Sequence, residues 1–424
     1  MVTGTPEARS ASFPGVLTIT YAYHVGDGMK FSIFLNPQVP GSGYLSEQHV
    51  GAKRPIGRDT DSYQAMLHEL RSIAVQADQT GFDALMLSEH HFHSEGLELS
   101  VNPLMVLADL AARTERLLLA PLGMVLPAWD PVRAAEDVAL LDQFCRGRLR
   151  LGLARGFQNR WVNVLGQRWE VTDASGDGSH TDDRNFEVFG EILKIMKMCW
   201  TQETVRYRSE ILDGYSIPQP FDGIADWPAV EWTRAYGAAD EIDEQGRVRA
   251  VSVCPRPYQD PYPELWQPFT MSDRSIVRCA QEDIVPWIFT PFLNEHRAKA
   301  ELYQSECAKF GREYKLGEHT GFLKMIGLAD TTEEAARVFN PSILNDFATF
   351  YGSFGFQDPS LIPEVGLFGA PDDVKRGLEK IFNSTPDLEW IGLFMIGQQG
   401  GLPLDRVLRS LELFAEEIIP EFRD

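Results

Sequence analysis

The sequence predicts an α/β protein built as a (β/α)8 barrel, the TIM barrel fold. Eight apolar runs of strand length alternate along the chain with amphipathic segments of helix length. The runs are apolar at nearly every position, which is typical of parallel strands buried on both faces. No G-x-G-x-x-G sequence follows the first run, so the pattern favours the barrel over a doubly wound sheet, the alternative that such alternation leaves open.

Each element is justified by its own residues. The expected strands are Lys30–Leu35, Asp83–Ser88, Leu117–Gly123, Leu149–Ala154, Leu265–Phe269, Val285–Thr290, Phe322–Gly327 and Trp390–Ile396. The expected helices cover residues 60–79, 131–144, 184–199, 272–281, 293–310, 331–348, 371–384 and 403–419. Asp130 before Pro131 is a helix start, two acids follow Pro371 where a helix N-terminus is positive, and Gly81 is a left-handed stop after the first helix.

Composition excludes several classes of protein. The 424 residues are 44% hydrophobic and 24% charged, with no window of eighteen apolar residues, so neither a membrane-spanning nor a disordered chain is expected. Sixty-one acidic residues against 39 basic ones give a net charge of -22, which argues against nucleic acid as a partner and requires a local cationic pocket for any phosphorylated ligand. Five scattered cysteines without a C-x-x-C pair favour a reducing, cytoplasmic location.

The chain divides into an N-terminal surface arm over residues 1–28, without a secretory signal, and one barrel domain over residues 29–424. An insertion of about a hundred residues, from about 157 to 263, separates the fourth and fifth strands. Thr172–Asp183 has the composition of a mobile loop, and we expect Asp213–Pro257 to form a lid or hairpin. Its aromatic residues, among them Trp227, Trp232 and Tyr236, are expected to close the barrel mouth.

In a TIM barrel the chemistry gathers directly after the strands, and the second strand is followed by a histidine-rich segment. Glu89, His90, His91 and His93 lie within five positions, where an imidazole can act as a general base and Glu89 can orient it. The alternative is that these histidines only fill the rim. A metal site on His91 and His93 is a further alternative, but the other histidines fall in the arm, loops or helices, so no complete ligand set is visible.

Three more strand ends carry candidate binding groups. Gly123 in the third strand permits close approach of a flat ligand or of another backbone. The fourth strand ends at Arg155, an anion ligand or a structural ion pair, and Arg184 begins the next helix and could converge with it. Thr270–Ser275 supplies hydroxyls and free N–H groups at a helix start, which suits a phosphate; plain N-capping by Ser272 is the alternative.

These motifs, taken in order, resemble those of the bacterial luciferase-like family of flavin-dependent monooxygenases. The matching segments are Met29–Leu35, Glu89–Phe92 (E-H-H-F), Val125–Pro127 with Pro131–Arg133, Gly147–Gly156 and the C-terminal Arg406–Arg423. No single match is specific, but five in the right order are. The resemblance covers nearly everything from Met29 onward.

The resemblance implies a barrel that binds FMN at the carboxyl ends of its strands. It implies ring contacts at Phe34, Leu122, Gly123 and Ala154 and phosphate ligands at Arg155, Arg184, Ser272 and Ser275. The Leu122–Gly123 bond matches a non-prolyl cis peptide of the family. Met271 departs from the pattern, because the luciferases often have an acidic residue there and contact the flavin partly through backbone. His90 matches the catalytic base, with His91 beside it.

The activity implied is that of a two-component monooxygenase. A separate reductase would supply reduced FMN, which reacts with O2 to a C4a-(hydro)peroxyflavin and oxygenates a small organic substrate in a dry cavity. The resemblance also implies a homodimer. The alternative on the same barrel is an oxidoreductase that transfers hydride with the deazaflavin F420, and a third class is a non-catalytic flavin-binding relative.

Overall fold

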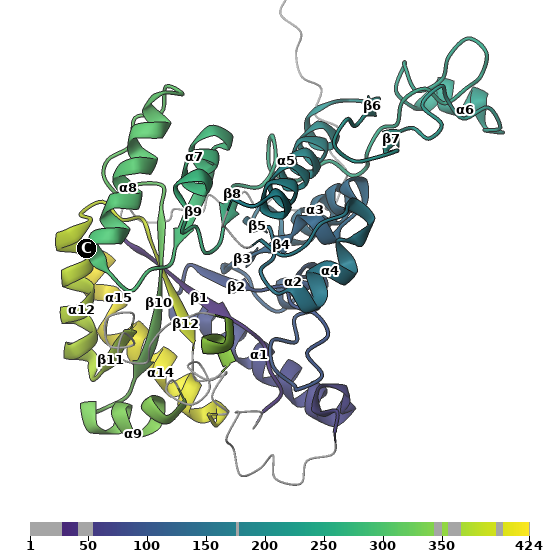
Figure 1. The fold of residues 1–424 in the computed structure, drawn as a ribbon. Coiled ribbons are helices and arrows are strands. Elements are labelled where there is room, and N and C mark those ends of the chain that lie inside the picture. Colours follow the sequence, from purple (N-terminus) through teal and green to yellow (C-terminus); the bar gives the residue numbers. More distant parts are fainter. Residues whose placement is uncertain are drawn as a thin grey trace, which may run out of the picture.

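The centre of the molecule is a ring of parallel strands at the positions that the sequence predicted (Figure 1). The structure is a computed structural model, and it describes residues 28–40, 54–174, 178–342, 350–354, 366–395 and 402–423. The ring strands are β1 (Lys30–Leu35), β2 (Ala84–Leu87), β3 (Leu118–Pro121), β4 (Met124–Val125), β5 (Leu151–Ala154), β8 (Leu265–Gln267), β9 (Ile284–Ile288), β10 (Gly321–Leu328) and β12 (Trp390–Met395). All eight predicted strands are confirmed, with β3 and β4 as two parts of one run.

The strands form a nearly closed parallel barrel, which confirms the predicted fold class. Their order is β3-β2-β1-β12-β10-β9-β8-β5-β4. Phe34 of β1 pairs with Met86 of β2 on one side and with Phe394 of β12 on the other. A bridge from Leu119 to Leu149, just before β5, brings the sheet back on itself. A further short strand, β11 (Gly366–Gly369), pairs with β10 outside this path.

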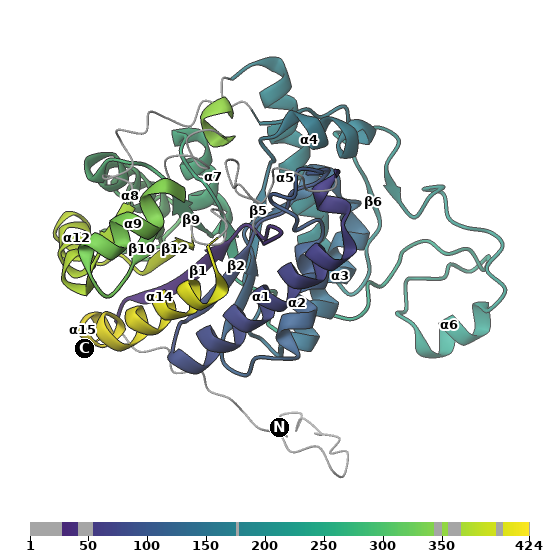
Figure 2. The same ribbon diagram turned by 90° about the horizontal axis from the view of Figure 1, so that it is seen from below.

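Helices surround the barrel (Figures 1 and 2). They are α1 (Thr60–Thr80), α2 (Pro103–Ala111), α3 (Pro131–Cys145), α4 (Asn159–Leu165), α5 (His180–Thr201), α6 (Val230–Tyr236), α7 (Asp273–Glu282), α8 (Leu293–Ala308), α9 (Thr332–Ser342), α12 (Pro371–Ser384), α14 (Leu404–Glu417) and α15 (Ile419–Arg423). The eight predicted helices are present, although positions 343–348 of one lie outside the described residues. Asp130 caps α3 by accepting the N–H groups of Val132 and Arg133, and Gly81 ends α1 with a φ of 96°, as predicted.

The barrel is sealed where its first and last helices meet. α14 packs against α1 (Figure 2), and Nη2 of Arg423 in α15 donates to the carbonyl of Gly81 at 2.7 Å and to Oδ2 of Asp83 at 2.5 Å. The interior is filled by large side chains, including the rings of Trp266, Trp287 and Trp390, whose centroids lie 5.0–5.9 Å apart. Because the interior is packed, a ligand has access only at the strand ends.

The insertion does not form the predicted aromatic lid. Its strands β6 (Tyr207–Arg208) and β7 (Ser216–Ile217) form a short antiparallel pair, and this segment with α6 projects away from the barrel (Figures 1 and 2). Trp232 and Tyr236 of α6 are 71% and 75% exposed. The expectation that these rings close the barrel mouth is therefore wrong. The arm predicted for residues 1–28 lies outside the described residues except at Gly28, and no described helix is long and apolar enough to span a membrane.

Candidate active site

A cavity of about 400 Å³ lies at the carboxyl ends of the barrel strands. Residues that follow β1, β2, β3, β5, β8, β9 and β12 all contribute to its wall. This volume falls in the range of small-molecule and cofactor sites. Phe157, Trp161 and Ala174, from the first part of the insertion, also line it, so the insertion contributes to the site near its N-terminal end and not through α6.

One wall of the cavity is flat and apolar. Leu122, Gly123 and Ala154 line it, and the Leu122–Gly123 peptide bond is cis, as the resemblance implies. A Cβ added at Gly123 would lie 3.0 Å from ring carbons of Pro268 and 3.1 Å from the Cβ of Ala154, so a side chain there would crowd both neighbours. Phe34 is not in the lining; its ring stacks behind that of Phe394, with centroids 5.2 Å apart. Phe34 thus contacts the cavity lining only indirectly, through the ring of Phe394.

The other end of the cavity offers hydroxyl groups at the start of a helix. Ser272 is the N-cap of α7: its Oγ accepts from the N–H of Ser275 at 3.3 Å and donates to Oγ of Ser275 at 2.9 Å. Both serines and Met271 line the cavity. The capping alternative is therefore realised, and the same two hydroxyls also face the space where a ligand would lie. A helix N-terminus with hydroxyls is suited to an anion.

Arginines gather at this end. Arg155 lines the cavity, and its Nη1 donates to Oδ1 of the buried Asp182 at 2.9 Å. The guanidinium groups of Arg155, Arg274 and Arg278 lie 5.4, 3.8 and 3.2 Å from the ring centroid of Phe186. Burial lowers the pKa of Arg278 to about 10, and the neighbouring charges of Arg155 and Arg274 act in the same direction. Arg274 also pairs with Asp183 at 2.5 Å, so the three guanidinium groups are partly balanced by acids, and of the three only Arg155 lines the cavity.

Arg184 does not belong to this pocket. Its Nε donates to the carbonyl of Trp169 at 3.1 Å and its Nη1 to the carbonyl of Ile211 at 3.0 Å, and the residue is not in the cavity lining. It ties α5 to two segments of the insertion. The structure thus does not support Arg184 as a phosphate ligand, and it places Arg274 and Arg278 near Arg155 instead. Arg274 belongs to the predicted Thr270–Ser275 seat, but nothing in the sequence singled out its guanidinium.

His90 and His91 of the histidine motif lie in different environments. His90 lines the cavity and is buried, and this burial lowers its pKa to about 3. Nε2 of His91 lies 3.1 Å from Oε1 of Glu89, and Glu89 also accepts from the N–H of Val125 at 2.7 Å. His91 is absent from the lining. Glu89 lines the cavity, but its hydrogen bonds orient His91 and the backbone after the third strand. It does not orient His90.

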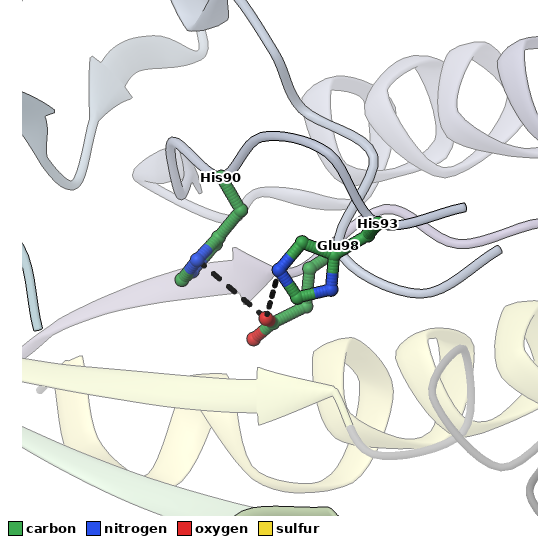
Figure 3. A group of neighbouring side chains, drawn as sticks. All are labelled: His90, His93 and Glu98. Carbon is green, nitrogen blue, oxygen red and sulfur yellow. Dashed lines mark ion pairs between the residues drawn. The ribbon is translucent and has the colours of Figure 1, made fainter. Parts of the chain in front are cut away.

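A carboxylate that the sequence did not single out lies beside His90. Oε2 of Glu98 is 3.5 Å from Nδ1 of His90 and 3.5 Å from Nε2 of His93 (Figure 3). Glu98 accepts hydrogen bonds from Tyr351 at 2.5 Å, Gln158 at 2.8 Å and Asn36 at 3.2 Å. Burial raises its pKa, while His93 and the hydroxyl and amide donors oppose that rise. In sequence, Glu98 is one acidic residue in a polar loop.

The ligand atoms of His90, His93 and Glu98 lie within 4.8 Å of one another, a spacing that a metal ion could also use. This is not the pair that the metal alternative named, because His91 is turned to Glu89. Three hydrogen-bond donors already occupy most of the acceptor positions of Glu98, and the amide of Gln158 bridges Glu98 and His93. The chemistry of the set therefore favours a hydrogen-bonded network over a metal centre.

Fold and cavity together define a class of parallel-barrel proteins whose ligand site lies at the carboxyl ends of the strands. One part of this site is apolar, and another part carries a guanidinium group and hydroxyl groups. Residues 29–230 match the family model of luciferase-like monooxygenases. The match assigns these residues, just under half of the chain, to that family.

Curated relatives of the chain agree with this assignment. A 3,6-diketocamphane 1,6-monooxygenase of Pseudomonas putida is 25% identical over 372 residues, which is 82% of this chain and 91% of the relative. An alkanal monooxygenase alpha chain of Photorhabdus laumondii is 42% identical over 90 residues, 21% of this chain and 24% of that one. The second match is thus a short segment.

Solved structures share the fold. A monooxygenase, RslO1, from Streptomyces bottropensis has a TM-score of 0.69 at 20% identity, over 93% of this chain and all of the other. The oxygenating constituent of a 3,6-diketocamphane monooxygenase from Pseudomonas putida, a type II Baeyer-Villiger enzyme in complex with FMN, has a TM-score of 0.68 at 20% identity, over 93% and 99%. A coenzyme F420-dependent tetrahydromethanopterin reductase of Methanopyrus kandleri has a TM-score of 0.58 at 13% identity, over 93% and 99%.

Proposed function

We propose that this protein is the oxygenating component of a two-component monooxygenase, which takes reduced FMN from a separate reductase and uses O2 to oxygenate a small organic substrate. The observation that carries the proposal is the mixed polarity of one cavity, which is lined by apolar residues and His90 and also by Arg155 and two serines at a helix start. A flavin mononucleotide has the same polarity, since a flat ring system carries a phosphate on a short chain.

The residues present fit this group. The ring would lie on the wall formed by Leu122, Gly123 and Ala154, where a side chain at position 123 would be crowded. Oδ1 of Asn36 and Oγ of Ser88 are buried in the lining and have no hydrogen-bond partner among the described residues, so the polar edge of a ring can satisfy them.

The phosphate would lie at the cationic end. Arg155, Ser272 and Ser275 would hold it, with the charges of Arg274 and Arg278 close behind. A phosphate dianion placed there gains charge-assisted hydrogen bonds from a guanidinium and from a helix N-terminus. Arg155 would have to share its guanidinium between the phosphate and Asp182.

When bound, reduced FMN would supply the reactivity toward O2, and one oxygen atom of the O2 would be added to the substrate. The chain contributes the surroundings of that reaction. Phe157, Trp161, Phe269 and Phe289 line the cavity and keep water from the reacting groups. His90 lines the same space, and burial, which lowers its pKa to about 3, keeps its imidazole neutral at ordinary pH, so that one ring nitrogen carries no proton.

The proposal is tested with the purified chain, a flavin reductase, NADH and FMN under ¹⁸O2, with a panel of ketones and aldehydes. We expect one ¹⁸O atom in the product and less peroxide when substrate is present. His90→Gln should lower turnover by about 10² to 10⁴ without loss of FMN binding. Turnover with reduced F420 and none with reduced FMN would select the hydride-transfer alternative, and binding without turnover of either would leave a non-catalytic relative.

We also propose that the chain forms a homodimer through α2 and α3. Met105 of α2 is 71% exposed, and Leu140 and Phe144, one turn apart on α3, are 43% and 57% exposed. α2 packs against α3, so these apolar side chains belong to neighbouring helices. Light scattering should give twice the chain mass of 47.7 kDa. Phe144→Glu should give monomers, while the same change at Phe310, exposed at the end of α8, should not.

A further inference from the structure

Next to the proposed flavin site, a network of buried polar side chains links four separate segments. Asn36 follows β1, Glu98 lies in the loop after β2, Gln158 precedes α4, and Tyr351 begins a 3-10 turn (Tyr351–Phe354). Each of the four is less than a tenth exposed. Polar groups buried so deeply need hydrogen-bond partners, and the pattern of partners fixes where the protons are.

The proton assignment starts at Trp161, because an indole N–H can only donate. It donates to one atom of the Gln158 amide at 3.1 Å, so that atom is the carbonyl oxygen. Nε2 of His93 lies 2.7 Å from the same oxygen and must therefore carry a proton. The NH2 group of Gln158 then points to Oε2 of Glu98 at 2.8 Å.

The same logic continues to His90. Oε1 of Glu98 accepts from Tyr351 and Asn36, and Oε2 accepts from Gln158, so the carboxylate acts only as an acceptor. Nδ1 of His90 is 3.5 Å from Oε2 and makes no shorter hydrogen bond among the described residues, while hydrogen bonding by Gln158 acts to raise the pKa of His90 (Figure 3). An acceptor next to Nδ1 favours the tautomer with the proton on Nδ1. The distance is at the outer limit of a hydrogen bond, as is common for catalytic pairs before the ligand binds.

We propose that Glu98 is a positioning residue, which keeps the proton of His90 on Nδ1 and so leaves Nε2 unprotonated as the proton acceptor toward the cavity. This rests on the proposed function for its role in turnover, but the tautomer itself does not depend on any flavin. When Nε2 accepts a proton, the carboxylate beside Nδ1 stabilises the resulting imidazolium, as a buried carboxylate does for a histidine in a catalytic triad.

The groups around His90 support this assignment over its rivals. His91 is turned to Glu89, and His93 donates to Gln158, so neither competes for Nδ1 of His90. Arg160 of α4 pairs with the exposed Glu95 at 2.6 Å and leaves Glu98 to the network. Glu98, and not the adjacent Glu89 of the E-H-H-F motif, is the carboxylate next to the imidazole that lines the cavity.

The test is ¹⁵N NMR of the full chain labelled at its nine histidines, at pH 7.5 and without flavin. The signals of His90 are assigned by their loss in His90→Gln. In the wild type, the correlations should show a proton on Nδ1; a proton on Nε2 overturns the proposal without any further variant. In Glu98→Gln, the amide oxygen should turn to the two donors Tyr351 and Asn36, which places an NH2 group beside Nδ1 and moves the proton of His90 to Nε2.

Turnover is measured on the same proteins with a matched control. Glu98→Gln should lower turnover at least about tenfold while Kd for reduced FMN changes less than twofold. Glu95→Gln, in the same loop but exposed, should change neither the tautomer nor turnover. An unchanged His90 tautomer in Glu98→Gln, or an equal loss in Glu95→Gln, overturns the proposal. The expected tautomers without any monooxygenase turnover in the wild type would refute the proposed function and not the assignment of Glu98.

Discussion

Nη1 of Arg155 lies 2.9 Å from Oδ1 of Asp182, so the guanidinium that faces the cavity already has a buried anionic partner. The two residues come from different elements, the end of β5 and the first turn of α5. The pair thus fixes the direction of Arg155 before any ligand arrives. A preoriented guanidinium loses less conformational entropy when it binds an anion.

This arrangement predicts that Arg155, and not Arg184, contributes to phosphate binding. Arg155→Gln should weaken FMN binding about 10- to 100-fold, because a hydrogen bond to a charged group contributes about 1.5 to 3 kcal/mol. Arg184→Gln should change FMN affinity less than twofold and lower Tm, since Arg184 binds two carbonyls of the insertion. Fluorescence titration measures both affinities.

Riboflavin, which lacks the phosphate, is the control ligand for this pair. Its affinity should be the same in the wild type and in Arg155→Gln, because only the phosphate contact is removed. A loss of riboflavin affinity as large as that of FMN would mean that the substitution disturbs the ring end of the cavity. A large loss of FMN affinity in Arg184→Gln would restore the assignment that the family resemblance implies.

The sequence was sufficient to predict the barrel, but it was not sufficient to predict the hydrogen-bond network around Glu98. Continuous apolar runs and terminal signals such as Asp130-Pro131 located the main helices and all ring strands except the two-residue β4, which follows the predicted third run. The same signal occurs at Asn102-Pro103, where Asn102 caps α2, but the nine residues of that helix are too few for a clear periodicity. Helices of seven to nine residues have only about two turns, too few for a recognisable apolar repeat.

The hydrogen-bond partners of Glu98 could not be predicted from a single sequence. Its three donors lie 62, 60 and 253 positions away along the chain, and each is an ordinary polar residue in its own segment. Only the closure of the barrel brings them together. Arg184 is the reverse case, because its position in the family pattern suggested a phosphate ligand, while local geometry turns its guanidinium to Trp169 and Ile211.

Stability should fall in mild acid through a histidine outside the active site. His296 is fully buried, stacks on Phe322 with ring centroids 3.8 Å apart, and burial lowers its pKa from 6.5 to about 3. Below about pH 6.5 this histidine therefore binds a proton in the unfolded chain but not in the folded chain. The free energy of unfolding decreases as the pH falls from there toward 3. Between pH 7 and 5 the cost is about 2 kcal/mol for one such histidine.

His296→Gln should remove that part of the acid sensitivity. Chemical denaturation at pH 7 and pH 5 should show a smaller difference in the free energy of unfolding for the variant, by about 2 kcal/mol, whatever its stability at pH 7. His68→Gln, an exposed position on α1, is the control and should keep most of the wild-type difference. Equal differences in the wild type and His296→Gln would show that His296 is protonated in the folded state.

Chelation should not affect this protein. Because Glu98 already accepts hydrogen bonds from Tyr351, Gln158 and Asn36, we expect neither turnover nor Tm to change after dialysis against EDTA. Elemental analysis of the purified chain should find less than about 0.1 zinc per chain. One zinc per chain that disappears in His93→Gln would instead assign His90, His93 and Glu98 to a metal centre.

The projecting part of the insertion should be dispensable for the protection of the reaction from water. The rings of Trp232 and Tyr236 contact each other in a tilted arrangement, with centroids 4.7 Å apart, and they are largely exposed and do not line the cavity. The double change Trp232→Ala and Tyr236→Ala should therefore leave the ratio of peroxide to product unchanged. Trp161→Ala, in the cavity wall, should raise that ratio several-fold, because it opens space for water beside His90. Peroxide and product are measured in the same reaction; a rise in the α6 variant equal to that in Trp161→Ala would mean that the projecting segment folds back over the barrel mouth during turnover.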